Sequence, residues 1–242
     1  MECRIFDNYN DLSDAAAELI LGIVERKPEA VLCFATGNSP VGTYKALAGM
    51  AKERGTDFSR CFCFGLDEWL GVPPEKRGSC NYLLFEQVFR PLGIKEEQTH
   101  LFNGMTTDVA TECRMMNGEI EYVGGIDCML VGVGLNGHIG FNEPGVDMES
   151  GAHEQELHES TLASGQLYFN EPTAIAKGIT LGMAQVMNAR TLLILANGKS
   201  KAEIIHKACE GPVTDDVPAS YMQKHRHAVL MIDKEAAAAL SK

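Results

Sequence analysis

The chain has 242 residues, of which 45% are hydrophobic, and it carries a net charge of −12 at pH 7. This length provides a sizeable core and suits one large α/β domain as well as two small ones. The acidic balance disfavours nucleic acids and anionic membranes as partners.

The start of the sequence is polar and lacks the basic and apolar regions of a secretory signal. No apolar run approaches the roughly 20 residues that a membrane-spanning helix needs. The eight cysteines lie mostly in apolar runs and form no CxxC pair, which indicates buried, reduced thiols. Cys61 and Cys63 alternate along one predicted strand, which favours packing over metal binding. We therefore expect a cytoplasmic protein.

Helical and strand patterns alternate along the chain. Apolar residues at helical spacing predict a first helix over 11–26. Short apolar runs predict strands at Val31–Ala35, Cys61–Leu66, Ile126–Val133, Thr191–Ala196 and Ala228–Ile232. Further helices are predicted at 40–53, 79–90, 108–123, 199–210 and 234–241, with Ser39 and Ser79 as candidate N-caps. Strands of this kind separated by amphipathic helices are typical of a mostly parallel sheet with helices on both faces.

No linker, repeat or low-complexity tract divides the sequence, so we expect a single domain over 1–242. The segment 145–175 is the least patterned part of the chain and is a candidate lid.

Polar clusters follow four of the predicted strands. They are TGNSP at 36–40, DEW at 67–69, GLNGHIGFNEPG at 134–145 and NGKSK at 197–201. In an open α/β sheet the carboxyl ends of the strands lie at one edge, where such folds bind ligands. We therefore expect these clusters to form one site.

Two of the clusters suit an anion. Backbone N–H groups at a strand–helix turn bind phosphate well, and the first cluster supplies such a turn from Thr36, Gly37, Asn38 and Ser39. Lys201 lies in the first turn of a predicted helix, where a cation opposes the helix dipole unless an anion binds nearby. An ordinary turn and a solvated lysine are the alternatives when each feature is taken alone.

The other two clusters carry proton-transfer chemistry. Asp67 ends a predicted strand beside an indole, where a carboxylate with a raised pKa suits a general base. His138 and Glu143 lie in a loop whose glycines and proline argue against a helix, and a carboxylate can orient a histidine. A turn cap and a structural histidine are the alternatives, and the spacing fits no familiar zinc motif.

Together the clusters resemble the glucosamine-6-phosphate deaminase/galactosamine-6-phosphate isomerase family, from about Val31 to Ile232. ATGNSPVGTYKAL, LDEW, GVGLNGHIGFNEPG, GITLGM and GKSKAE occur in the family's order. The NGHIGFNEPG segment is highly specific, whereas the TGNSP loop alone is not. The resemblance implies a modified doubly wound, Rossmann-like α/β sheet.

The resemblance also implies roles for the site residues. Asp67 would move a proton from C2 to C1 of a hexosamine 6-phosphate. His138 would assist ring opening, with Glu143 in its proton network, and the loop 36–39 with Lys201 would hold the phosphate. Ammonia would leave C2 to give a ketose 6-phosphate, without a metal or an organic cofactor.

Two positions depart from the family pattern. Asn136 stands where an aspartate is usual, and an amide oxygen accepts a hydrogen bond but carries no charge. Leu167 aligns with an arginine that binds phosphate in glucosamine-type members. LDEW, RGSC at 77–80, RPLGIKEEQ at 90–98 and KGITLGMAQVMNAR at 177–190 resemble the galactosamine-6-phosphate isomerase branch. We therefore expect galactosamine 6-phosphate as the substrate and tagatose 6-phosphate as the product, with glucosamine 6-phosphate as the alternative.

Other functions are compatible with the fold. A 6-phosphogluconolactonase has a related glycine–histidine loop, but that loop continues differently from Phe141 onward. A sugar-phosphate sensor without catalysis would explain Asn136 and Leu167, although no DNA-binding module fits in the sequence. Both a monomer and a homo-oligomer are compatible with the sequence.

Overall fold

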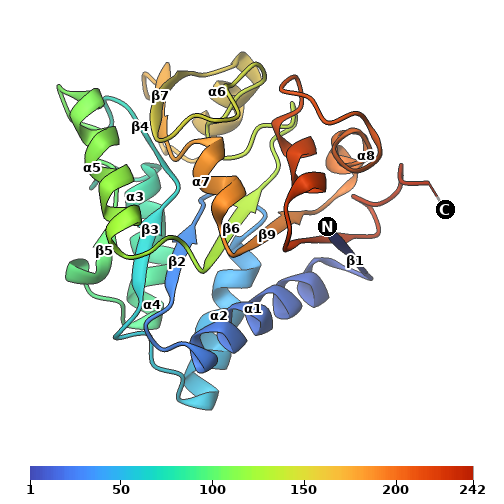
Figure 1. Ribbon diagram of the computed structural model, residues 1–242, viewed down its shortest axis with the longest axis horizontal. Coiled ribbons are helices and arrows are strands. Elements are labelled where there is room, and N and C mark those ends of the chain that lie inside the picture. Colours follow the sequence, from blue (N-terminus) through green and yellow to red (C-terminus); the bar gives the residue numbers. More distant parts are fainter. Residues whose placement is uncertain (242) are drawn as a thin grey trace.

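The computed structural model describes residues 1–241 and contains a seven-stranded parallel sheet in the order β1-β10-β9-β6-β2-β3-β5 (Figure 1). Its strands are β1 (Glu2–Phe6), β2 (Val31–Phe34), β3 (Phe62–Gly65), β5 (Thr99–His100), β6 (Cys128–Gly132), β9 (Thr191–Ala196) and β10 (Ala228–Asp233). The central strands are buried on both faces, because apolar residues occupy successive positions along them. The predicted parallel sheet is therefore confirmed.

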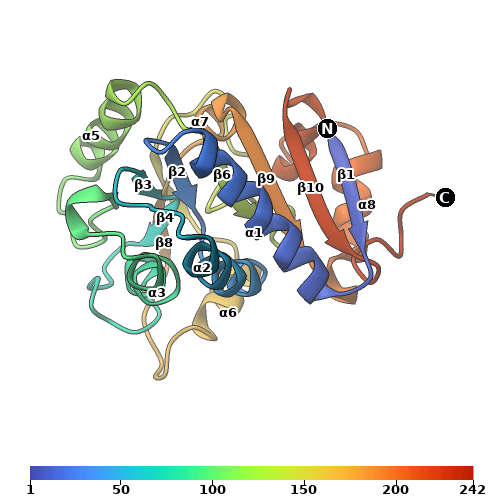
Figure 2. The same cartoon turned by 90° about the horizontal axis from the view of Figure 1, so that it is seen from below.

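Helices cover both faces of this sheet. They are α1 (Tyr9–Arg26), α2 (Val41–Arg54), α3 (Cys80–Leu84), α4 (Arg90–Leu92), α5 (Val109–Tyr122), α7 (Met183–Asn188) and α8 (Ala202–Glu210). A further helix, α6 (Glu159–Gln166), packs against Trp69 outside this sheet. A π-helical stretch (Phe85–Phe89) joins α3 to α4, and short 3₁₀ helices span Glu96–Gln98, Lys199–Lys201 and Pro218–Lys224. One core contains residues of α1, α2 and the π-helical stretch, and the other contains residues of α5, α7 and α8. Figure 2 views the molecule from the side of α1 and α2. The α/β fold class is thus confirmed.

A second, three-stranded antiparallel sheet lies next to the large one. It contains β4 (Asp67–Trp69), β8 (Lys177–Thr180) and β7 (His153–Glu156), in the order β4-β8-β7. The chain passes from the large sheet to the small one at Leu66, whose N–H donates to Phe34 O while its carbonyl accepts from Leu181 N–H. The segment 145–175 supplies β7 and α6 here; its role as a lid stays a prediction.

Some predicted elements differ from the structure. Residues 234–241 were expected to be helical, but they form turns and a bend over 234–240 and no regular structure at 241, because so short a segment gains little from helix propensity alone. Ser39 does not cap α2, since its hydroxyl donates to Asn197, whereas Ser79 does cap α3. The sequence pattern missed the short strands β1, β4, β5, β7 and β8 and the helices α6 and α7.

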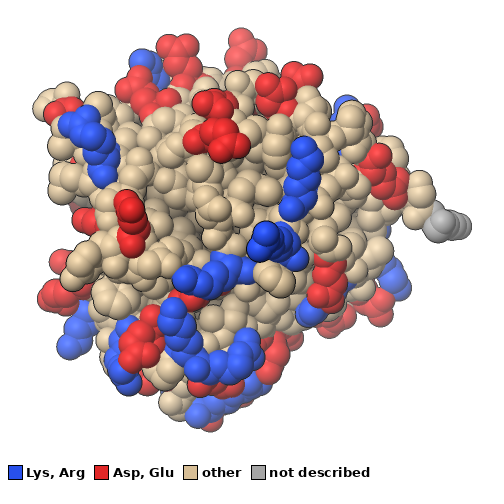
Figure 3. Space-filling view, in the orientation of Figure 1, with Lys and Arg blue, Asp and Glu red and all other residues tan. Residues whose placement is uncertain are grey.

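The surface charges are mixed. On the face shown in Figure 3, basic side chains are interspersed with acidic ones. The eight cysteines are all free, six of them buried. Within residues 1–241, no helix has the length and hydropathy needed to cross a membrane.

Candidate active site

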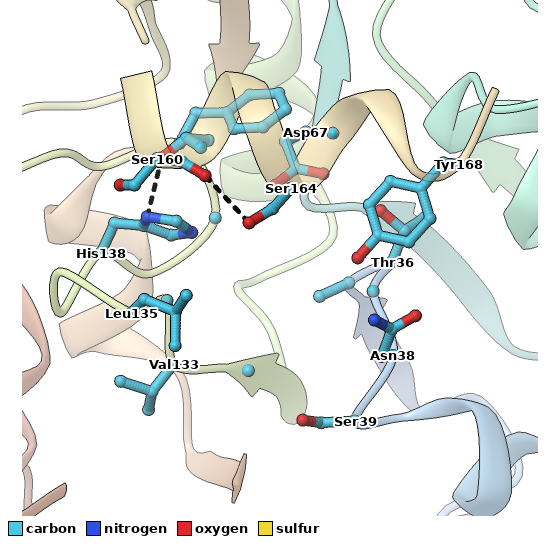
Figure 4. Close-up of a pocket in the computed structure, with 18 of the residues that line it drawn as sticks. Thr36, Asn38, Ser39, Asp67, Val133, Leu135, His138, Ser160, Ser164 and Tyr168 are labelled. Carbon is cyan, nitrogen blue, oxygen red and sulfur yellow. Dashed lines mark hydrogen bonds between the residues drawn. The ribbon is translucent and has the colours of Figure 1, made fainter. Parts of the chain in front are cut away.

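The loops that follow β2, β3, β6 and β9 meet at the carboxyl edge of the large sheet and enclose a cavity of about 270 Å³ (Figure 4). This is close to the lower end of the roughly 300–1,000 Å³ typical of small-molecule sites. The predicted site residues that line it are Thr36, Gly37, Asn38, Ser39, Asp67, His138 and Lys201. Asn136 and Glu143 do not line the cavity but contact His138 from behind. The structure thus brings together all the predicted site residues.

The loop 36–39 has the geometry of an anion site. Gly37 has φ 120°, which favours glycine. The hydroxyl of Tyr9 lies 3.1 Å from Asn38 O and 2.9 Å from Ser39 O and accepts from Gly42 N–H at 2.7 Å, so it fixes the loop from outside. Within residues 1–241, the N–H groups of Gly37 and Ser39 donate to no protein acceptor. Such free N–H groups suit a phosphate.

Lys201 is the cation of the cavity wall. Its Nζ donates to Val133 O at 2.6 Å, which leaves two of its three protons for a ligand. None of the ion pairs among the described residues includes Lys201. Burial lowers the pKa of its ammonium group, as expected for a cation without an anionic partner. A bound phosphate would restore that partner.

Asp67 lies at the junction of the two sheets, where β4 begins directly after Leu66. It pairs with Thr180 in β8 and is only 7% exposed. Burial raises the pKa of its carboxyl to about 7; the thiol of Cys80 opposes this shift, and the charge of Glu68 adds to it. A carboxyl with this pKa in a cavity wall is suited to accept and return a proton near neutral pH.

Glu68, the next residue along β4, has a structural role. Its carboxylate accepts hydrogen bonds from the N–H groups of Trp69 (2.7 Å), Cys80 (2.9 Å) and Asn81 (2.8 Å). It therefore anchors the start of α3 beside β4. Adjacent residues of a strand point to opposite faces, which separates this buried carboxylate from Asp67 in the cavity.

His138 is held from behind by an amide and a carboxylate. The Asn136 amide must direct its NH₂ group toward Glu143 Oε2 (2.7 Å), because a carboxylate only accepts. Asn136 Oδ1 then faces His138 Nδ1 at 2.7 Å. In the neutral imidazole, Nδ1–H therefore donates to this oxygen and Nε2 carries the lone pair. A Cβ at Gly134 would lie 2.2 Å from His138 Cε1, so only glycine leaves room for the ring.

Glu143 is the charged residue in the chain of hydrogen bonds that runs from His138 through Asn136. Its Oε2 lies 3.6 Å from His138 Nδ1, and its Oε1 accepts from His158 N–H at 3.2 Å. Burial by itself raises the pKa of Glu143, but its interactions with His138, and then with Thr161 and Asn136, outweigh burial and lower the pKa to about 2. Glu143 therefore stays ionised, so it can orient this chain of hydrogen bonds but cannot act as a proton donor at neutral pH.

The sequence analysis missed the wall that α6 provides. Ser160, Thr161, Ser164 and Tyr168 line the cavity, and Thr161 Oγ1 lies 3.1 Å from His138 Nδ1. These residues belong to the segment with the weakest periodicity. The signals that pointed to them were a hydroxyl-rich stretch ending in two aromatic residues and the alignment of the neighbouring Leu167 with a phosphate-binding arginine.

Comparisons with known proteins show the family of the chain. Residues 7–231 match the family model described as glucosamine-6-phosphate isomerases/6-phosphogluconolactonase. The chain belongs to this family.

Relatives of similar length support the assignment. The chain is 40% identical to the glucosamine-6-phosphate deaminase of Thermoanaerobacter sp. (strain X514), with 98% of this chain and 94% of the relative covered. It is 41% identical to the glucosamine-6-phosphate deaminase of Halothermothrix orenii, with 99% and 100% covered. These relatives bear the name of one branch of the resemblance seen in the sequence.

Solved structures share the fold. One, described as a monomeric glucosamine-6-phosphate deaminase, superposes with a TM-score of 0.96 at 33% identity and covers 99% of this chain and 100% of its own. The 6-phosphogluconolactonase from Trypanosoma brucei superposes with a TM-score of 0.79 at 19% identity over 99% and 98%. At that identity, the second likeness shows the fold alone.

Proposed function

We propose that this family member is an isomerising deaminase that converts glucosamine 6-phosphate to fructose 6-phosphate and ammonia. The observation that carries the proposal is the position of Asp67, a buried carboxyl with a pKa of about 7, in one cavity with His138 and an unpaired Lys201. A base, a ring-opening group and an anion site are the parts that this reaction requires.

The phosphate anchors the substrate. The free N–H groups of the loop 36–39 and the ammonium group of Lys201 hold the dianion, and the sugar extends toward Asp67 and His138. Because the anchored phosphate lies away from the reacting carbons, the sugar stays bound while its ring opens.

His138 acts on the O1 hydroxyl and the ring oxygen O5, because Nε2 of the neutral imidazole carries a free lone pair while Nδ1–H donates to Asn136. It removes the proton of the O1 hydroxyl and delivers it to O5 as the C1–O5 bond breaks, which gives the open aldehyde. Glu143 keeps the Asn136 amide, and through it the imidazole, in this orientation.

Asp67 then removes the proton from C2, and O1 is protonated to give an enolamine. Asp67 returns the proton to C1, which leaves an iminium group at C2. Water adds to C2 and ammonia departs, so that the product is the 2-ketose 6-phosphate. A carboxyl with a pKa near 7 suits both halves of this transfer.

The names of the relatives decide which epimer of the hexosamine 6-phosphate we propose as the substrate. The sequence motifs favoured the galacto epimer, whereas relatives at about 40% identity are named glucosamine-6-phosphate deaminase. Their names support the gluco alternative better than the galacto preference, so we propose glucosamine 6-phosphate as the preferred substrate.

The test is to incubate the purified protein with each hexosamine 6-phosphate and follow ammonia and ketose phosphate together. We expect faster turnover of glucosamine 6-phosphate. Faster turnover of galactosamine 6-phosphate would keep the mechanism and reverse the choice of epimer. Hydrolysis of 6-phosphogluconolactone without hexosamine turnover would overturn the proposal, as would binding of both hexosamine phosphates without turnover.

A further inference from the structure

We propose that the hydroxyl of Tyr168 is a ligand of the substrate's phosphate, together with the loop 36–39 and Lys201. This inference rests on the proposed function and adds a residue that the sequence analysis did not assign. It follows from the position of the phenol, from its unused proton and from the charge of the cavity wall.

The position of Tyr168 is set by the residues around it. Its N–H donates to Gly165 O at 3.0 Å at the end of α6. The next residue, Phe169, is buried against Trp69, and a Cβ at Gly78 would lie 2.5 Å from its ring. With Phe169 fixed in this way, the Tyr168 ring extends into the cavity, and Figure 4 shows its hydroxyl near Thr36 and Asn38.

The hydroxyl lies at the anion loop. It is 3.7 Å from the position that a Cβ would take on Gly37, so a side chain at that residue would approach the phenol. The backbone N–H of Asn38 faces the phenol oxygen and lowers the pKa of Tyr168, against the effect of burial. A phosphate oxygen bound by the neighbouring N–H groups of the loop would therefore lie within reach of the phenol.

The hydroxyl of Tyr168 is an available hydrogen-bond donor. Burial, and then the charges of Cys80 and Asp67, raise the pKa of Tyr168 above its usual value, so the group is a neutral donor in the physiological range. None of the hydrogen bonds among residues 1–241 has this O–H as the donor. The O–H proton is thus free among the described residues, which is the arrangement expected beside a bound anion.

The cavity wall carries little positive charge, so the phenol would add a useful neutral hydrogen-bond donor for the phosphate. Lys201 is the single Lys or Arg in the cavity wall, as far as the described residues show, and Asp67 is in the same wall. A phosphate dianion therefore meets one cation and one carboxyl. Neutral donors such as backbone N–H groups and a phenol bind the anion without further disturbing the pKa of Asp67.

A different role for the same hydroxyl predicts the opposite result. If the phenol only occupies the anion position in the empty protein, the phosphate has to displace it. Removal of the hydroxyl would then tighten binding. The sign of the change in affinity thus separates a ligand from a competitor.

The experiment compares Tyr168→Phe with wild type, using calorimetric binding of inorganic phosphate and the KM for glucosamine 6-phosphate. Tyr122→Phe is the matched control, because the same atom is removed from a side chain that is 91% exposed. We expect roughly tenfold weaker phosphate binding and a similarly raised KM, with kcat nearly unchanged, for Tyr168→Phe alone. Unchanged or tighter phosphate binding would overturn the inference.

Two further measurements separate the possible failures. Binding of unphosphorylated glucosamine should be equal in wild type and Tyr168→Phe, and an equal loss for both ligands would show a structural effect and overturn the inference. Phosphate binding is measured without turnover. A protein that binds phosphate through Tyr168 but releases no ammonia would therefore disprove the proposed function and keep this assignment.

Discussion

The junction of β3 and β4 and the loop 134–145 each supply a buried carboxyl to the site, Asp67 and Glu143, and these two carboxyls behave in opposite ways. Asp67 is 7% exposed and Glu143 is 4% exposed. The pKa of Asp67 is nevertheless raised to about 7, whereas that of Glu143 is lowered to about 2. Burial is the largest influence on both and acts in the same direction.

The partners make the difference. Glu143 receives hydrogen bonds from Asn136 and His158 and faces the ring of His138. Asp67 has the weak donor Cys80 and the like charge of Glu68. The fold surrounds Glu143 with hydrogen-bond donors, so this carboxyl stays ionised. It gives Asp67 few donors, so this carboxyl can take up and release a proton near neutral pH.

The largest expected effect comes from replacement of Asp67, the carboxyl that accepts and returns the proton. Asp67→Asn should reduce kcat for deamination by at least about 10²–10⁴-fold, the range for loss of a general base. Binding of inorganic phosphate should stay close to that of wild type, because the substitution leaves the loop 36–39 and Lys201 in place. Normal turnover by this variant would show that Asp67 is not the base.

The same substitution should stabilise the protein at neutral pH. The carboxyl of Asp67 has a usual pKa of 3.8 and a folded-state pKa of about 7. Wild type therefore loses stability as pH rises from about 4 to 7, because the unfolded chain releases this proton first. In urea unfolding, Asp67→Asn should exceed wild type by on the order of 2–4 kcal/mol at pH 8 and by little at pH 4. An equal difference at both pH values would contradict the raised pKa.

The pH dependence of wild-type activity should follow Asp67 and not Glu143. A base with a pKa of about 7 must be ionised to act, so kcat/KM should fall about tenfold per pH unit below pH 7. Rates measured from pH 5 to pH 8 check this, with phosphate binding at each pH as the control for ligand ionisation. A flat profile over this range would assign the proton transfer to another group.

A smaller loss is expected from Glu143→Gln. The glutamine would place an NH₂ group against either Asn136 or His158, both of which donate to Glu143. The Asn136 amide then no longer holds its oxygen toward His138, and we expect kcat to fall roughly ten- to a hundredfold. Glu149→Gln on the exposed surface is the matched control.

The pH profile of Glu143→Gln sharpens the comparison. Its acid midpoint should stay near pH 7, because Asp67 sets it. A shift of that midpoint by a full unit would show that the two carboxyls are coupled.

Much of the site was predictable because local sequence and backbone topology determine it. Apolar runs identified β2, β3, β6 and β9, and polar clusters after parallel strands must meet at one sheet edge. Convergence of Asp67, His138 and Lys201 therefore followed from chain order alone. The predicted preference for galactosamine 6-phosphate rested on the similarity of sequence motifs, because local sequence does not show which side chains distinguish the two epimers of the substrate.

Other features depended on contacts between distant residues. The short strands β4, β7 and β8 carry too few residues for a clear period, and they form because Leu66 joins the two sheets. The Ala-rich segment 234–241 has high helix propensity, yet it forms turns, because so short a segment needs tertiary packing to be helical.

The sequence by itself determined the α/β class, the strands of the core and the set of residues at the sheet edge, because hydrophobic periodicity and chain order are local properties. Only the tertiary structure decided which buried carboxyl holds a proton near neutral pH. It also directed the free hydroxyl of Tyr168 toward the anion loop, because donors from distant segments set both a pKa and the direction of a side chain.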